Sequence, residues 1–399
     1  MIKLTFLGDI MCDQMMINTF KLCDNHYDFT SLFSQVVPLF RDSDYVFGNL
    51  ETPISCNNEF LTKERYSFNT PIEFAIAVHD AGVNFVATAN NHCLDRGTAG
   101  ISSTITALNK IGLKHTGVFD DKAIKETPLV IDIKGVKLGI SSYTYGTNAF
   151  SNHQYLKNRE FWKVNLFQNQ ELSNPLDRIC YAHRHHPLFF WYKFLSEMRY
   201  KGNITKPVYE RRESDRRCIC NLKNDIKTLK EAGADLIIMY SHVGGQYNIV
   251  PTDYTVQLVD KLIQYGVNIV VGCHEHVIHG GILNRVTENV AATYSLGNFV
   301  GSNGTYSPPY DKLSEYSVVW NVYINEDKII SKTSFCLLKS IIAVDGKLKI
   351  VPCVDLLDSN LLDNMEKRKL LNEMMFIAET FSGMKIDGKT VVENKELFL

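Results

Sequence analysis

Short apolar runs alternate with amphipathic stretches along the first 150 residues of the chain. Strand-like runs occupy residues 2–7 (IKLTFL), 44–47 (DYVF) and 83–89 (VNFVATA), and helical patterns lie near residues 71–81 and 98–111. Strands that alternate with helices are typical of layered α/β proteins, in which helices cover a mostly parallel sheet. The pattern therefore predicts an α/β core.

Three segments share one arrangement: a helix end, a glycine, an apolar strand, and then an asparagine or a histidine. They run from Gly82 to Asn91, from Gly233 to His242 and from Gly266 to His274. A glycine directly after a helix readily takes the left-handed C′ conformation. Since the carboxyl ends of strands in an open α/β sheet face the functional crevice, we expect these three strand ends to meet at one place. Three unrelated surface side chains are the alternative.

Residues 151–220 break the pattern. They contain 13 Lys and Arg against 7 Asp and Glu, a basic surplus of six, together with many aromatic side chains. A segment so rich in aromatic residues is not typical of disorder. We expect an inserted, partly helical subdomain, either a lid that contacts substrate or a packing appendage with solvated charges.

The remaining chain completes the expected organisation. Strand-like runs at residues 316–324, 334–344 and 348–356 are expected to close a second sheet, and an amphipathic pattern at 361–380 predicts a helix. The apolar face expected for that helix comprises Leu361, Leu362, Met365, Leu370, Leu371 and Met374. The predicted division is a core of residues 1–150 and 221–356, an insertion at 151–220, and a C-terminal helix and tail at 357–399.

Composition narrows the class of protein. The 42 basic and 44 acidic side chains give a formal charge of −2, which argues against a nucleic-acid partner, because phosphate neutralisation needs a basic excess. The ten cysteines form no C-x-x-C pair, which favours reduced thiols in a cytosol-like compartment. The sequence shows no signal peptide and no run of apolar residues long enough to span a membrane, so we expect a cytoplasmic protein.

Side chains of metal-ligand type stand at the predicted strand ends. Asp9 follows the first strand, Glu51 the second, and Asn91 and His92 the third. His242, His274 and His276 follow two later strands. Carboxylate, amide oxygen and imidazole together suit Mn²⁺, Fe or Zn²⁺ better than a thiolate site would. The sequence therefore predicts a centre for one or two divalent metal ions.

These residues lie in motifs that resemble, in order, those of the CapA family of capsule and poly-gamma-glutamate biosynthesis proteins, within the calcineurin-like metallophosphoesterase superfamily. The resemblance covers roughly residues 1–150 and 220–300. The motifs are G-D-I-M (8–11), G-N-L-E-T-P-I (48–54), N-N-H-C-L-D-R-G (90–97), S-Y-T-Y-G-T-N (142–148), S-H-V-G-G-Q-Y (241–247), G-C-H-E-H-V (272–277) and Y-S-L-G-N-F-V (294–300).

The resemblance implies a four-layer α/β/β/α sandwich with the metal centre at the strand ends. It assigns Asp9 and His276 to a first metal and Glu51 to a bridging position. It assigns Asn91, His242 and His274 to a second metal. Met11 stands where the superfamily usually has a histidine, so the first metal lacks one ligand.

The resemblance also implies roles for residues beside the metals. His92 occupies the general-acid position, and Asp95 is placed to hold the other nitrogen of its ring. Asn49, Tyr143 and Asn298 are candidates for substrate contacts. For Tyr143 the satisfaction of buried backbone groups, and for Asn298 a role in a tight turn, are equally consistent with the sequence.

The function implied is that of a metal-dependent hydrolase, a phosphoesterase in capsule or envelope polymer biosynthesis. Metal-activated water would attack phosphorus, with His92 as the acid. The arginines at 211, 212, 216 and 217 suit an anionic small-molecule or polymer substrate, although a solvated linker explains them equally well. Two alternatives are a non-hydrolytic accessory component of a polymer-synthesis complex and metal-dependent amide chemistry on a gamma-glutamyl polymer. CapA relatives commonly have an N-terminal anchor. The lack of one in this sequence suggests a soluble, intracellular substrate.

Overall fold

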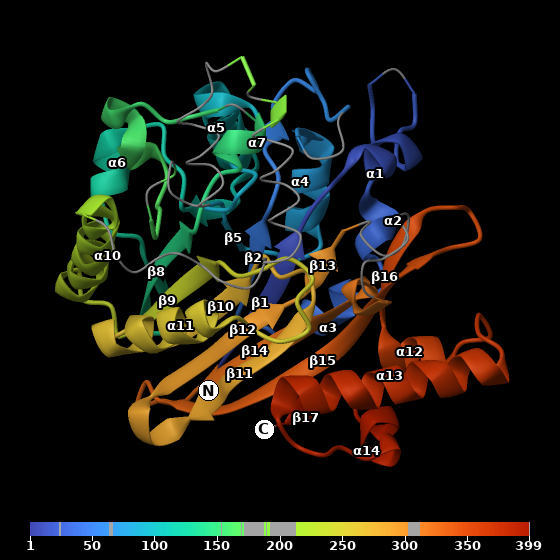
Figure 1. Cartoon of the computed structure of the whole chain (residues 1–399). Coiled ribbons are helices and arrows are strands. Elements are labelled where there is room, and N and C mark those ends of the chain that lie inside the picture. The colour runs from blue at the N-terminus through green and yellow to red at the C-terminus, as the bar shows by residue number, and fades with distance from the viewer. Residues whose placement is uncertain are drawn as a thin grey trace.

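Two large β-sheets form the centre of the computed structural model (Figure 1). The structure describes residues 1–23, 25–63, 67–152, 154–168, 170, 187–188, 190–191, 213–301 and 312–398. The mixed α/β class predicted from the alternation of strands and helices is confirmed.

The first sheet runs in the order β16-β15-β14-β1-β2-β5-β6, and β13 and β17 pair with β1 and β15. Strands β1, β2, β5 and β6 are parallel, whereas β14, β15 and β16 are antiparallel. The strands are β1 (Ile2–Ile10), β2 (Tyr45–Leu50), β5 (Phe85–Ala87), β6 (Lys114–Thr116), β13 (Asn298–Val300), β14 (Tyr316–Ile324), β15 (Ile330–Ile342), β16 (Leu348–Pro352) and β17 (Leu397–Phe398).

The second sheet runs in the order β11-β12-β10-β9-β8-β7, with parallel inner strands and antiparallel edge strands. Its strands are β7 (Val130–Ile133), β8 (Val136–Thr144), β9 (Leu236–His242), β10 (Ile269–Cys273), β11 (Ile278–Arg285) and β12 (Val290–Leu296). A separate pair joins β3 (Ile54–Ser55) to β4 (Thr70–Pro71).

Aromatic side chains from both sheets fill the space between them. Phe6 of β1 stacks on Phe47 at 5.0 Å between ring centroids and lies 5.5 Å from the ring of Trp320. Tyr240 of the second sheet approaches Phe6 at 6.4 Å. All four side chains are fully buried, and each ring of this size removes about 150–250 Å² from water, so this contact is a main source of cohesion between the sheets.

Helices cover the outer faces of both sheets. On the first sheet these are α1 (Gln14–Thr19), α2 (Thr30–Phe33), α3 (Val37–Phe40), α4 (Ile72–Asp80) and α5 (Gly97–Ile111). On the second they are α10 (Glu213–Glu231) and α11 (Asp253–Tyr265), which bury leucines such as Leu222 and Leu262. Gly82, Gly233 and Gly266 end helices or helical turns with φ between 84° and 107°, as the repeated glycine pattern predicts.

The C-terminal region packs against the two sheets on another side, through α12 (Cys353–Asp358), α13 (Asn364–Ser382) and α14 (Gly388–Glu393). The predicted helix exists, and Leu370 and Met374 of its predicted apolar face are buried, but the prediction is wrong for Leu361 and Met365. Asp363 caps a helix that begins only at Asn364, so Leu361 precedes it, and Met365 in its first turn is 76% exposed. The buried face comprises Leu370, Met374, Ile377, Ala378 and Phe381.

The charged tail after residue 385, in which the sequence shows no motif, contributes to the first sheet. Leu397 of β17 is buried in the core between the sheets. The neighbouring Glu396 accepts hydrogen bonds from the side chains of Asn321, Tyr323 and Ser334. A partly buried carboxylate with several donors holds this end of the chain in place.

Only part of the predicted insertion lies within the described residues. Its first residues form the end of α7 (Ala149–Asn152) and the 3₁₀ turn η1 (Asn158–Lys163), and its last residues begin α10. Arg211 and Arg212 lie outside the described residues, and Arg216 and Arg217 lie exposed on α10. Among the helices that the structure describes, none combines the length and the apolar character required to cross a bilayer.

The two methionines of α13 provide a matched test of the corrected face. Met374→Ala should lower the free energy of unfolding by about 2–5 kcal/mol, because Met374 is 1% exposed and its truncation leaves a cavity. Met365→Ala should change it by less than about 0.5 kcal/mol. Urea titration followed by circular dichroism measures both values. Equal destabilisation by the two substitutions would contradict the observed face.

Candidate metal centre

Strand ends from both sheets meet in one buried cluster. Asp9 lies near the end of β1, pairing with Asn49 of the adjacent parallel β2, and Glu51 directly follows β2. His242 ends β9 and pairs with Cys273, the last residue of the neighbouring β10. The strand ends that the glycine pattern singled out therefore come together, and they do so across the space between two sheets.

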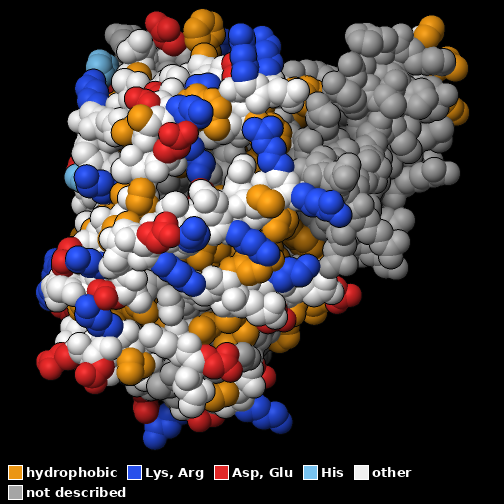
Figure 2. Space-filling view, turned by 90° about the vertical axis from the view of Figure 1, so that its left-hand side faces the viewer, with side chains coloured by type: hydrophobic (Ala, Val, Ile, Leu, Met, Phe, Trp, Pro, Cys, Tyr) orange, Lys and Arg blue, Asp and Glu red, His pale blue; other side chains and the backbone are white. Residues whose placement is uncertain are grey.

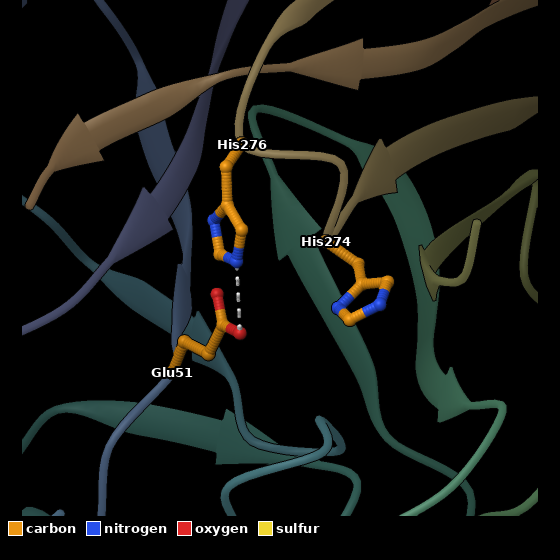
Figure 3. Close-up of side chains that lie close together, drawn as sticks. All are labelled: Glu51, His274 and His276. Carbon is orange, nitrogen blue, oxygen red and sulfur yellow. Dashed lines mark ion pairs between the residues drawn. The ribbon is translucent and has the colours of Figure 1, made fainter. Parts of the chain in front are cut away.

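Six predicted ligands are at most 2% exposed and lie close together. Asp9, Glu51 and His242 offer ligand atoms that all lie within 4.8 Å of one another. Glu51, His274 and His276 form a second such group (Figure 3). The sixth, Asn91, joins through its Oδ1 atom, which lies 2.8 Å from His242 Nε2.

Glu51 belongs to both groups, as expected of a bridging ligand. The structure groups Asp9 with His242 and His274 with His276, whereas the resemblance assigns Asp9 with His276 and His274 with His242. The distribution of ligands between a first and a second metal therefore stays a prediction.

The Glu51 carboxylate has the environment of a metal ligand. Neither of its oxygen atoms has a hydrogen-bond partner among the described residues, although the side chain is fully buried. Burial, together with the Asp9 carboxylate, raises the pKa of Glu51 to about 8. A buried carboxylate without donors is costly unless a cation compensates it, so the residues present fit a divalent metal.

Two histidines of the cluster, His242 and His274, are held in the neutral form that binds metals. Burial lowers the pKa of His242 to about 3 and that of His274 well below its usual value. His276 Nδ1 lies 2.8 Å from Asn298 Oδ1, an acceptor, so Nδ1 donates to it. The other ring nitrogen, Nε2, faces Glu51 at 3.9 Å, as Figure 3 shows.

Asn49 and Asn298 lie behind the predicted ligands and orient them. Asn49 Nδ2 donates to Asp9 Oδ1 at 2.7 Å and lies 3.1 Å from His242 Nδ1. Both asparagines are at most 1% exposed. The structure therefore places these two candidates for substrate contact in contact with ligand side chains, and their direct role toward substrate stays a prediction.

The backbone at His274 and His276 is strained. His274 and His276 have φ values of 97° and 60°, a left-handed region that costs a residue with a Cβ about 1–3 kcal/mol. The His274 amide donates to Asp9 Oδ2 at 3.0 Å. Glu275 between them turns away from the cluster and accepts a hydrogen bond from the Gly245 amide at 2.9 Å. These contacts hold both imidazoles toward the cluster.

His92 and Asp95 form the predicted pair. His92 Nδ1 lies 2.7 Å from Asp95 Oδ2, and Asp95 also accepts from the Phe68 amide and from the Asn152 side chain. Burial by itself would lower the pKa of His92, but the carboxylates of Asp95, Glu51 and Asp9 together, Asp95 first, raise that pKa above its usual value. Asn152, the second residue of the predicted insertion, therefore borders this part of the site.

Tyr143 lies apart from the cluster. Its hydroxyl donates to Asp225 of α10 at 2.6 Å, and its ring packs on Phe167 on the outer side of the second sheet. Its neighbour Tyr145 instead packs on His274 at 4.7 Å between ring centroids. The role predicted for Tyr143 stays a prediction, and Tyr145 is the tyrosine of this motif that contacts a predicted ligand.

Three residues that were not predicted as site residues contact the site or the loops that carry it. Tyr247 packs on His276 at 5.4 Å, Glu275 anchors the loop after β9, and Asn152 contacts Asp95. Tyr247 and Glu275 carried a signal, since they stand in the S-H-V-G-G-Q-Y and G-C-H-E-H-V motifs, whereas Asn152 stands in none of the quoted motifs. Cys12 and Cys273 are buried, and desolvation raises the pKa of both thiols, which keeps them protonated and poor ligands.

Comparison with known proteins now gives the family. The model of the family described as bacterial capsule synthesis protein PGA_cap matches residues 3–303. The chain belongs to this family. It is 23% identical over 306 residues to the capsule biosynthesis protein CapA of Bacillus anthracis, covering 76% of this chain and 60% of the relative.

A second relative is the PGA biosynthesis protein CapA of Bacillus subtilis (strain 168), at 24% identity over 303 residues, 75% of this chain and 63% of the relative. A third is the uncharacterized protein y4sH of Sinorhizobium fredii (strain NBRC 101917 / NGR234), 23% identical over 290 residues, 67% of this chain and 61% of the relative. The chain thus aligns with less than two thirds of the length of each of these relatives.

The raised pKa of Glu51 predicts that metal binding depends on pH. Below about pH 8 the metal must displace one proton from Glu51, so affinity should rise by about tenfold per pH unit and then level off. Competition with a fluorescent chelator for Mn²⁺ or Zn²⁺ across this range measures the slope. In Glu51→Gln the slope should disappear and the affinity should fall. An equal slope in both proteins would contradict the role of Glu51.

Proposed function

We propose that this protein is a metal-dependent hydrolase of the phosphoesterase type that acts in capsule or envelope polymer biosynthesis. The observation that carries the proposal is the buried Glu51 carboxylate, which finds no hydrogen-bond donor in the part of the chain that the structure describes and is shared by two groups of possible metal ligands. Burying the charged form of such a carboxylate costs free energy unless a cation compensates it, and a bound metal ion would supply both that compensation and the means for chemistry.

The metal would be held by Asp9, Glu51, His242, His274 and His276, with the amide oxygen of Asn91. Carboxylate, amide and imidazole ligands suit Mn²⁺, Fe or Zn²⁺. When bound there, one or two such ions supply Lewis-acid polarisation of a phosphoryl oxygen and activation of water.

His92 is proposed as the general acid. Its Nδ1 is occupied by Asp95, so its Nε2 is the atom that can deliver a proton to the leaving oxygen. The Asp95 carboxylate raises the pKa of His92, which favours the protonated ring needed for this step. Phe68 packs on the ring at 4.4 Å between centroids and limits its rotation.

The substrate is proposed to be an anionic small molecule or polymer. Two relatives are named for capsule biosynthesis and for PGA biosynthesis, which supports a polymer or its precursor as the substrate class. Because the chain spans only about 60% of these relatives, the full activities behind those names are carried over only as a proposal.

We further infer the four-layer α/β/β/α arrangement of metallophosphoesterases for the core formed by residues 1–150 and 221–356. Support comes from the two facing sheets and from the separate apolar clusters under the helices on each outer side. The insertion at 151–220 would act as a partial lid, since its residue Asn152 contacts Asp95 beside His92.

A non-hydrolytic accessory role is favoured by one observation. Met11, which is buried, places a thioether where the superfamily usually supplies an imidazole, so the centre has one strong ligand fewer. A protein of this kind would bind metal and an anionic polymer without turnover.

Metal-dependent hydrolysis of a gamma-glutamyl amide would instead release amines rather than phosphate.

Removal of a proposed ligand should abolish metal binding and activity together. His242→Ala and His274→Ala should each lower metal content by at least half and phosphate release from a panel of phosphoesters by at least about a hundredfold. His79→Ala, in an exposed ion pair with Asp80, is the control and should change neither. Full metal content and full activity in both ligand variants would contradict the proposed site.

The role of His92 should be visible in the dependence on the leaving group. His92→Ala should lower kcat for an alkyl phosphate by about 10²–10⁴-fold, since general acid catalysis contributes that much, and much less for p-nitrophenyl phosphate, whose leaving oxygen needs no proton. Metal content should stay unchanged. Equal losses on the two substrates would assign His92 to another role.

A further inference from the structure

A second polar cavity lies on the outer side of the molecule, between α6 (Lys122–Glu126), η1 and α10. Its volume is about 310 Å³, at the lower end of the range for small-molecule sites. Its floor is formed where the edge strand β6 of the first sheet approaches β8 of the second, and includes Thr116, Ser141 and Asn165. None of these residues belongs to the metal centre.

The floor presents polar side chains that lack partners. Thr116, Ser141 and Asn165 are only 7%, 5% and 4% exposed, and the side chain of none of them has a hydrogen-bond partner within the described residues. The protein does not fully enclose the polar atoms of these three side chains, so these atoms face the cavity. Hydroxyl and amide groups that face a cavity and have no protein partner are free to hydrogen-bond a polar ligand that enters it.

The charged side chains of the cavity compensate one another. Lys125 Nζ pairs with Asp225 Oδ2 at 2.7 Å, and Tyr143 donates to the same carboxylate. The remaining charged lining residues are Glu126 and Arg217, one of each sign. Figure 2 views the side that carries α6 and α10, and basic, acidic and apolar side chains are interspersed over it. The balance of charges favours a neutral ligand over an anion.

The wall adds aromatic surface. Trp162 of η1 and Phe119 line the cavity, and Phe119 is held under the Lys125 ammonium group at 5.4 Å from the ring centroid. An aromatic face beside hydroxyl and amide groups matches a molecule with one apolar C–H face and several hydroxyls. Asn165 offers both a donor and an acceptor, which suits hydroxyls that both donate and accept.

We propose that this cavity binds a neutral sugar unit, with Asn165, Ser141 and Thr116 hydrogen-bonding its hydroxyls and Trp162 packing against its C–H face. The inference does not depend on the phosphoesterase proposal. The cavity is nonetheless linked to the metal centre through β8 and the segment beside it. The Thr144 amide donates to the Asn165 carbonyl at 3.0 Å, and Tyr145, the next residue, packs on His274.

Direct binding of monosaccharides to the full chain tests the proposal. Glucose and N-acetylglucosamine are titrated by ligand-observed NMR and calorimetry, with glucuronate and glutamate as anionic counterparts. The neutral sugars should bind with Kd values of about millimolar and more tightly than the anions. Asn165→Leu and Trp162→Ala should weaken binding by at least about tenfold, and Ser141→Ala by about threefold to tenfold.

Ser142→Ala is the matched control for Ser141→Ala. The Ser142 hydroxyl accepts from the Ala89 amide at 3.2 Å instead of lining the cavity, so its removal should leave sugar binding unchanged. Asn165→Leu should not lower Tm, because it removes a polar group that has no partner in the protein. If that variant fails to fold, Trp162→Ala and Ser141→Ala carry the test.

The outcomes separate this inference from the proposed function. His274→Ala should lose metal and activity but keep sugar binding. The sugar proposal is overturned if neither neutral sugar binds, if the anions bind more tightly, or if binding survives undiminished in the cavity variants. None of these results would bear on phosphate release at the metal centre.

Discussion

The buried carboxylate of Glu51 is the constraint on which the site depends. It directly follows β2 of one sheet and faces imidazoles that belong to the other sheet, and no described residue donates a hydrogen bond to either of its oxygens. A group in this position opposes folding unless positive charge reaches it. The two sheets must therefore be held firmly enough by their shared aromatic core to keep it buried, and the same rigidity fixes the spacing of the ligands.

Local signals were sufficient to predict which polar side chains come together in the buried cluster. Asp9, Glu51, His242 and His274 each stand at or directly after the carboxyl end of an apolar strand, and strand ends of parallel sheets meet by geometry. The α/β class follows from the same alternation. The pairing of the two sheets, with β14 and β15 completing the first one, depends on contacts between distant segments and has no local signature.

The features that the sequence did not predict also depend on contacts and caps outside the local pattern of apolar residues. Tyr143 and Tyr145 are two residues apart, but β8 ends at Thr144, so strand alternation no longer determines where Tyr145 points. Part of the α13 face was misassigned because the Asp363 cap delays the start of the helix and leaves Leu361 outside it. Asn152 and Glu275 owe their contacts to partners in other loops. Residues that hold the predicted site residues in place thus carry less signal in the sequence than residues at strand ends.

The central place of β1 has a consequence for how the chain folds. Ile2 pairs with Ile324, and β1 lies between strands that are separated from it by about 40 and about 310 residues of sequence. During synthesis the first strand would leave the ribosome long before its antiparallel neighbour exists, with one edge and an apolar surface uncovered. Such chains fold slowly and aggregate readily at high expression levels. Chaperone availability and growth temperature should therefore influence the yield of folded protein more strongly than the stability of the finished structure would suggest.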